Sequence, residues 1–254
     1  MITRKTKSRI AIILSVTLFG AAIAIISILM YLRQCSNPSP SPSGFPIDLP
    51  IVSSVETGTS DGFPEVDWDY WLGINPDIVG WITIEGTNIN HPIVAASQDD
   101  PDYYLHHDVY GNCNPLGAVY LDADSVAEGG LDSRNAVIAG HHGRGLNGIT
   151  AFEDVTNYLD KSFAEGHAIV LIQTPTEKRK YEIRFAGIVK GSEHNKFTQF
   201  ADDAAFKEWY DAQKEAASMT LDTDTEPDKV ISLVSCSYTT WAWNERTVVI
   251  ASEL

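Results

Sequence analysis

The sequence predicts a mainly β protein: an eight-stranded barrel with helices at its N-terminal side and one helix inserted before the penultimate strand. Three observations lead to this prediction. About eight short segments of the 254-residue chain have strand-like patterns, glycine, asparagine and proline stand at the joints, and one late segment has helical spacing instead. A closed barrel is the economical arrangement for so many short strands, because it leaves few unpaired edges.

The N-terminal part of the chain divides into three stretches by composition. Residues 1–9 are basic, residues 10–32 form the uncharged run IAIILSVTLFGAAIAIISILMYL, and residues 33–62 include the Pro/Ser-rich stretch SNPSPSPSGFPIDLP. The apolar run is long enough to cross a bilayer, and the basic residues before it favour an N-terminus inside the cell. We therefore expect a cytoplasmic tail, a single-pass anchor in the cell membrane and a stalk, with residues 63–254 as an extracellular domain.

The charge balance and the absence of phosphate-binding loops narrow the function. The chain has 34 acidic and 18 basic residues, a formal net charge of −16. An acidic protein repels phosphate groups, which argues against a nucleic-acid partner. G-x-x-x-x-G-K does not occur in the sequence, and we interpret the one match to G-x-G-x-x-G, the stretch GRGLNG, as a turn, so no nucleotide cofactor is expected.

Two segments have helical spacing. The stretch PEVDWDYWLGINPDIVGW, with its proline and glycine breaks, predicts one or two short helices leading into the domain. The stretch TQFADDAAFKEWYDAQKEAASM places Phe200, Phe206, Trp209 and Tyr210 at helical intervals behind an acidic first turn. We expect this helix to lie between two strands of the sequence and to pack its aromatic side chains on the barrel.

The predicted strands follow the first helices in order. Two lie in GWITIEGTNINHPIV on either side of a Gly-Thr-Asn turn, and the others lie in GAVYLD, AVIAGH, AIVLIQT, KRKYEIRFAGIVKG, KVISLVSC and RTVVIAS. The last two are separated by the loop from Ser237 to Glu245. This connection predicts an antiparallel pair.

Cys236 ends the penultimate predicted strand, and Arg246 opens the last one. Antiparallel pairing brings both to the same end of the sheet, where a guanidinium favours a thiolate or binds a developing negative charge. A nucleophilic cysteine also needs a base and donors for an oxyanion. The alternative is a buried structural cysteine, since cysteine packs as a small apolar residue. The other cysteines, Cys35 and Cys113, could form a bridge with each other.

The base is sought among the histidine doublets His106-His107 in YLHHD and His141-His142 in AVIAGHHGRG. The second doublet is the better context because a buried strand delivers it at its end. Adjacent residues of an extended chain face opposite sides, so one of the two can face Cys236, and periodicity alone does not choose between them. No His-x-His, His-Glu-x-x-His or Cys-x-x-Cys pattern is present, so no metal is expected.

From Trp68 to Leu254 the chain resembles the sortases, the cysteine transpeptidases of Gram-positive surfaces. The resemblance is carried by NPDIVGWITIEGTNINHPIV, DYYLHHDVYGNCNPLGAVYLD, AVIAGHHGRGLNGITAFEDV and ISLVSCSY…NERTVVIA. It implies a barrel with Cys236 as nucleophile, His141 as acid/base and Arg246 as the residue that binds the oxyanion or the substrate. The leading helices and the helix in the penultimate connection resemble class B.

The same resemblance implies the partners. The substrate would be a sorting signal near the C-terminus of an exported protein, held as a thioester and passed to an amine of a peptidoglycan precursor or a pilin lysine. Ser235, Ser237, Trp241 and Trp243 are the expected substrate-binding residues, with ordinary packing as the alternative for the tryptophans. Two other functions stay open: a hydrolytic cell-wall cysteine peptidase, and a non-enzymatic surface protein in which Cys236 is structural.

Overall fold

The computed structural model describes residues 61–142, 152–191, 197–221, 226–241 and 244–254. Within these ranges one mixed sheet contains the strands β1 (Ile78–Thr83), β2 (Asn90–Ala95), β3 (Tyr120–Leu121), β4 (Asn135–Gly140), β5 (Ile169–Gln173), β6 (Lys178–Lys190), β7 (Met219–Thr220), β8 (Val230–Cys236) and β9 (Glu245–Glu253). The helices are α2 (Trp68–Ile74), α3 (Tyr103–His106), α4 (Ala123–Ala127), α5 (Lys161–Gly166) and α6 (Asp203–Ala216), with 3₁₀ turns η1 (Gly130–Asp132) and η2 (Glu153–Leu159).

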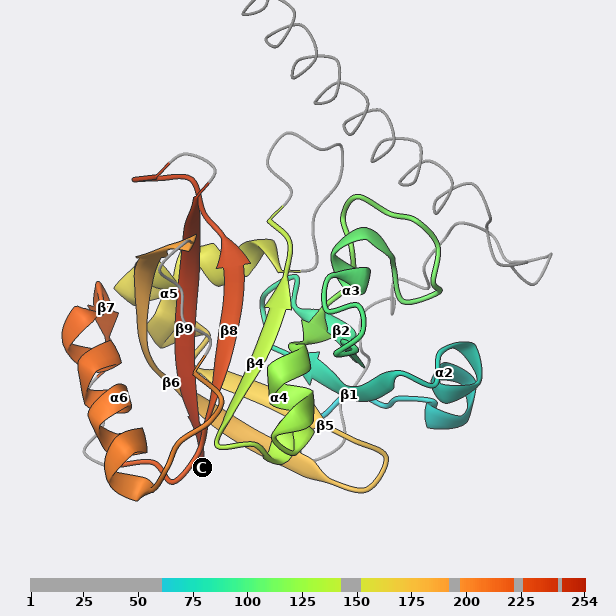
Figure 1. The fold of residues 1–254 in the computed structure, drawn as a ribbon, viewed down its shortest axis with the longest axis horizontal. Coiled ribbons are helices and arrows are strands. Elements are labelled where there is room, and N and C mark those ends of the chain that lie inside the picture. Colours follow the sequence, from blue (N-terminus) through green and yellow to red (C-terminus); the bar gives the residue numbers. More distant parts are fainter. Residues whose placement is uncertain (1–60, 143–151, 192–196, 222–225, 242–243) are drawn as a thin grey trace, which may run out of the picture. The chain divides into compact units, whose positions relative to one another are not determined.

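The strands close into a barrel. Their order is β5-β1-β2-β3-β4-β8-β9-β6-β7, and a further pairing of β5 with β6 joins the two ends of an eight-stranded ring (Figure 1). The two-residue strand β7 adds to the outside of this ring by pairing with β6. The predicted eight-stranded barrel is therefore confirmed, with β7 as a short addition that the sequence pattern did not reveal.

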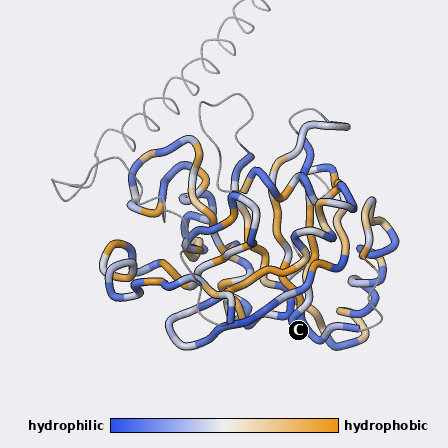
Figure 2. Tube along the Cα trace, turned by 180° about the vertical axis from the view of Figure 1, so that it is seen from behind, coloured by the Kyte–Doolittle hydropathy of each residue, from blue (hydrophilic) through white to orange (hydrophobic). Residues whose placement is uncertain are grey.

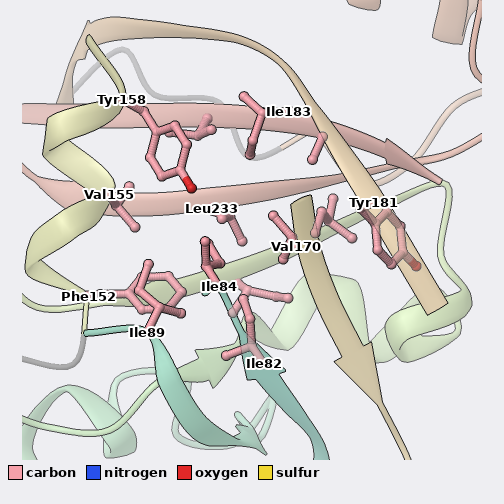
Figure 3. Packing of buried hydrophobic residues seen from close by; sticks show 14 of the residues in the cluster. Ile82, Ile84, Ile89, Phe152, Val155, Tyr158, Val170, Tyr181, Ile183 and Leu233 are labelled. Carbon is pink, nitrogen blue, oxygen red and sulfur yellow. The ribbon is translucent and has the colours of Figure 1, made fainter. Parts of the chain in front are cut away.

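The inside of the barrel is an apolar core to which nearly every strand contributes alternate residues. Figure 3 shows side chains of Ile82, Val170, Ile183 and Leu233 converging from different strands, with Tyr158 of η2 beside them. Full burial of one such aliphatic side chain contributes on the order of 1.5–3 kcal/mol. Figure 2 shows the resulting concentration of hydrophobic residues along the strands.

Helix α6 covers an outer face of the sheet, next to β6 and β7 (Figure 1). It begins where the side chain of Asp202 accepts a hydrogen bond from the backbone N–H of Ala205, an N-cap that satisfies one free donor of the first turn. Its buried residues Phe206 and Tyr210 face the sheet, and the Tyr210 ring packs edge-on against Phe185 of β6 at 5.3 Å. The inserted helix and its aromatic contact with the barrel are confirmed.

Helix α2 is the described leading helix, capped by the side chain of Asp67, which accepts from the backbone N–H of Tyr70. Ahead of it, Phe63 is buried, and the side chain of Gln173 donates to the carbonyl oxygen of Pro64 at 2.9 Å. The chain thus joins the packed domain by Phe63. The boundaries predicted at residues 9 and 32 lie outside the described ranges, the boundary at residue 62 lies at the start of the described part, and all three remain predictions.

The predicted membrane localisation needs a correction. In the part of the chain that the structure describes, no helix has the length and apolar character required to cross a membrane. On this finding the prediction of a single-pass protein anchored in the cell membrane is wrong. The run at residues 10–32, on which that prediction rested, lies outside the described residues.

Candidate active site

Cys236 and Arg246 lie opposite each other in the antiparallel pair of β8 and β9. The register runs from Val230 opposite Ser252 to Cys236 opposite Arg246, so the cysteine and the arginine occupy the same end of the barrel. Cys236 is a free thiol, and both side chains are partly exposed. The antiparallel pairing predicted for these strands is confirmed, and a partly exposed cysteine at a rim does not fit the buried structural alternative.

Strand β4 lies on the other side of β8 and runs parallel to it (Figure 1). The last pair in this register is Gly140 with Ser235. His141 follows Gly140, the last residue of β4, and Cys236 follows Ser235 as the last residue of β8, so the two lie at the same edge of the sheet. Parallel pairing of strands far apart in sequence thus brings the histidine strand beside the cysteine.

Gly140 has a physical reason to be glycine. A Cβ added there would lie 2.8 Å from Cβ and 2.9 Å from Cγ of Phe152, whose side chain is fully buried. Real Cβ contacts are not that short, so any larger residue would have to displace the aromatic ring or the strand. The glycine before His141 lets β4 lie directly on the core at the point where the site begins.

Alternation along β4, β8 and β9 decides which side chains share a face, because successive residues of a strand point to opposite sides. The two packed faces are marked by Ile138, Leu233 and Val249 on the inner side and by Val137, Val234 and Val248 on the outer side. His141, Cys236 and Arg246 continue the outer set. His142 and Glu245 continue the inner set. The structure therefore separates the two histidines, which the sequence pattern alone left equivalent.

The ring of His141 is held by helix α3. Its Nε2 lies 2.9 Å from the carbonyl oxygen of Leu105. A carbonyl oxygen accepts hydrogen bonds, so Nε2 carries the hydrogen and Nδ1 is the nitrogen left to take up or release a proton. Gly117, at φ +61°, lies against this ring: an added Cβ would be 3.1 Å from His141 Cδ2 and 2.5 Å from the carbonyl oxygen of Tyr104.

His142 contacts the cysteine through the backbone. Its Nδ1 donates to the carbonyl oxygen of Cys236 at 3.0 Å, and its Nε2 lies 3.8 Å from Oε1 of Glu153. The ring also packs at 5.6 Å, centroid to centroid, against Tyr238. Through these contacts His142 connects the end of β4 to the end of β8.

Arg246 is held by main-chain groups. Its Nη1 donates to the carbonyl oxygen of Glu245 at 2.9 Å. Gly191, which follows β6, approaches so closely that an added Cβ would lie 3.3 Å from this Nη1 and 2.8 Å from Oδ1 of Asn244. The guanidinium is thus confined between the end of β6 and the start of its own strand, which limits the orientations of its donors.

Tyr120 of β3 is a residue of this region that the sequence analysis missed. It is buried and belongs to the outer packed face, next to β4, the strand that precedes His141. Burial raises the pKa of Tyr120, the charges of Asp122 and Cys236 raise it further, and Arg246 lowers it. The tyrosine is therefore neutral at pH 7. Because Tyr120 lies within an apolar strand, its sequence context did not distinguish it from an ordinary core residue.

The four residues predicted to bind substrate are placed differently from one another. Ser235 is buried and its Oγ donates to the carbonyl oxygen of Gly140 at 3.0 Å, and Ser237 is also buried. Trp241 has 40% of its surface exposed, and Trp243 lies outside the described residues. The exposed tryptophan is the one of the four that the described structure presents to solvent, and the substrate roles remain predictions.

In the other histidine doublet, His106-His107, the second histidine contacts residues outside this site. His107 is buried, stacks on Tyr103 at 3.9 Å, and its Nε2 lies 3.5 Å from Sγ of Cys113. The suggested partner of that sulfur, Cys35, lies outside the described residues. Within the described ranges no group of three or more His, Cys, Asp or Glu side chains could hold a metal ion.

Comparison with known proteins gives a consistent result. Residues 82–254 match the family model described as Sortase domain. Sortase B of Staphylococcus aureus (strain NCTC 8325 / PS 47) is 26% identical over 181 residues, 70% of each chain. Sortase B of Listeria monocytogenes serovar 1/2a is 28% identical over 166 residues, or 64% of each chain, slightly less than two thirds of that protein. The solved sortase B of Clostridium perfringens has a TM-score of 0.63 at 25% identity, covering 73% of this chain and 98% of that one.

The family model covers more than half of the chain, and the barrel and the curated relatives agree with it. The predicted resemblance is thereby confirmed. The chain belongs to the sortase family of cysteine transpeptidases, and the relatives that it matches are class B members.

Proposed function

We propose that Cys236 is the nucleophile, His141 the general acid and base, and Arg246 the oxyanion- or substrate-binding residue of a transpeptidase that cleaves a C-terminal sorting signal. The observation that supports this most directly is the shared face: the three side chains continue the same side of three adjacent strands at one end of the barrel. A thiol, a proton carrier and a fixed cation at one edge are the groups that acyl transfer requires.

The first step forms a thioester. The Cys236 thiolate attacks the carbonyl carbon of the scissile peptide bond, and negative charge gathers on the carbonyl oxygen, where the Arg246 guanidinium can donate hydrogen bonds. As the C–N bond breaks, the imidazolium of His141 gives its proton to the leaving amine. The signal's C-terminal fragment departs and the substrate stays attached to sulfur.

The second step transfers the acyl group. An acceptor amine loses a proton to the now neutral His141 and attacks the thioester carbonyl, a new amide bond forms, and the thiolate leaves. No electrons are exchanged, and the proton returns to the imidazole. The acceptor would be an amine of a peptidoglycan precursor or a pilin lysine. Since one solved sortase B structure is described as a complex with triglycine, that tripeptide is the first acceptor to test.

The experiment is a mass measurement on the full chain with a panel of sorting-signal peptides. Without amine we expect a covalent adduct on Cys236, and with triglycine a ligated peptide. Cys236→Ala should give neither. Release of hydrolysed peptide alone, whatever the amine concentration, would instead make the protein a cysteine peptidase. Failure to form any adduct, together with a thiol inert to iodoacetamide at neutral pH, would contradict the catalytic role and favour a structural cysteine.

A further inference from the structure

Glu245, the first residue of β9, is a fully buried carboxylate at the rim of the barrel. Its Oε1 accepts hydrogen bonds from the backbone N–H of Thr239 at 2.9 Å and from Thr239 Oγ1 at 2.8 Å. Its Oε2 accepts from the backbone N–H of Thr240 at 2.6 Å and of Trp241 at 2.8 Å. Three consecutive backbone N–H groups therefore converge on one carboxylate, an arrangement suited to holding a negative charge.

The hydrogen bonds between Glu245 and the loop depend on the carboxylate being ionised. Burial raises the pKa of Glu245, but the hydrogen bonds from Thr239 and Trp241 outweigh burial and lower the pKa to about 2. The group is ionised at neutral pH. A neutral amide in its place would turn an NH₂ group toward backbone donors, so the loop could not keep all four contacts.

The backbone carbonyl of Glu245 accepts hydrogen bonds from Arg246 and from the residue after Cys236. Its carbonyl oxygen accepts from the backbone N–H of Ser237 at 3.2 Å and from Nη1 of Arg246 at 2.9 Å. Ser237 directly follows Cys236. One residue thus holds the segment after the nucleophile through its carboxylate and carbonyl, and holds the guanidinium through its carbonyl.

We propose that Glu245 is a positioning residue of the active site, whose buried carboxylate fixes the loop from Ser237 to Trp241 and thereby places Cys236 and Arg246 relative to a bound peptide. This inference rests on the roles proposed above for those two residues. Trp241, at the end of the clamped segment, is 40% exposed, so the loop held by Glu245 is also a surface that a peptide can reach.

The test compares Glu245→Gln with Glu253→Gln in the full chain. Glu253 ends the same strand and makes a surface ion pair with Lys229 at 2.7 Å, so its replacement is a matched control. Glu245→Gln should lower kcat/KM for peptide transfer by about tenfold to a hundredfold, since a displacement of about 1 Å can cost that much. Hydrogen exchange at the amides of residues 239–241 should become at least about tenfold faster.

Two readouts separate positioning from general damage. Alkylation of Cys236 by iodoacetamide should stay within about threefold of wild type in Glu245→Gln, because a small reagent needs no ordered loop. Glu253→Gln should match wild type within about twofold in both transfer and exchange. A folded Glu245→Gln chain with wild-type transfer kinetics and unchanged exchange at residues 239–241 would overturn the proposal.

If Glu245→Gln does not fold, Thr239→Val serves instead, because it removes one of the four hydrogen bonds. It should lower kcat/KM by about threefold to tenfold and speed exchange at Thr240 and Trp241, and wild-type values for both would overturn the proposal. Exchange needs no substrate. An inactive wild type would therefore count against the proposed function, whereas an active wild type with unprotected amides at 239–241 would count against the role of Glu245 alone.

Discussion

Replacing Gly140 by alanine tests whether the histidine strand depends on its close approach to the core. The added methyl group would lie 2.8 Å and 2.9 Å from two carbons of Phe152, and this side chain is fully buried in the core. His141 is the next residue, so any shift of the strand that relieves the clash also moves the proposed acid/base.

The size of the effect follows from this geometry. Forcing one methyl group into a filled core costs about 1–3 kcal/mol. For a domain of this size each kcal/mol lowers Tm by about 2–4 °C, so Gly140→Ala should melt about 2–12 °C below wild type. If the strand end moves by about 1 Å, peptide transfer should fall by about a hundredfold.

Thermal melting and transfer kinetics on the full chain measure both effects. Gly73→Ala in α2 is the control, because a Cβ there meets no atom within 4 Å and alanine is the better helix former. It should melt at or slightly above the wild-type temperature and keep full activity. If Gly140→Ala matches the control in both measurements, the close approach to Phe152 does not constrain the site and the reasoning fails.

Other variants probe the site directly. His141→Ala should lower the transfer rate by about 10²–10⁴, whereas His142→Ala, which removes one hydrogen bond to a carbonyl, should cost less than about tenfold; the reverse ranking in steady-state kinetics would contradict the assignment. Arg246→Lys should lose about 10²–10³ in transfer rate, nearly as much as Arg246→Ala, because lysine lacks the planar set of hydrogen-bond donors of a guanidinium. A lysine variant that keeps most activity would mean that Arg246 acts only through its positive charge. The Glu245 pKa of about 2 lies below its ordinary 4.5, so its ionised contacts stabilise the fold above pH 4.5 and are lost as pH falls toward 2. After allowance for screening at the rim this contributes on the order of 1–3 kcal/mol, and urea melts at pH 6 and pH 3 should show a smaller drop in unfolding free energy for Glu245→Gln than for wild type.

The strands and the inserted helix could be predicted because their patterns are local. The aromatic spacing of Phe206 and Tyr210 and the turn signals between strands need no knowledge of the rest of the chain. The choice between His141 and His142 could not be made in that way. Every residue of β4 is buried, so alternation gives no polar and apolar contrast, and the faces differ only in which elements cover them.

The contacts that hold the site also escaped the sequence because they use main-chain groups. The carbonyl oxygen of Leu105 holds His141, and the backbone N–H groups that surround Glu245 are present in every residue other than proline. Neither leaves a pattern of side chains. The acidic residue before the arginine was visible in the sequence, but its role depends on how the preceding loop folds back.

The parallel pairing of β4 with β8 has a consequence for how the chain acquires reactivity. His142 and Cys236 are 94 residues apart in sequence, and β5, β6 and α6 must be made between them. Contacts of such large sequence separation form late, because loop-closure entropy opposes them until the rest of the structure is in place. Under the proposed roles, a chain whose barrel has not yet closed therefore carries the thiol of Cys236 without the histidine and the guanidinium beside it, and the proposed chemistry begins only when the barrel closes.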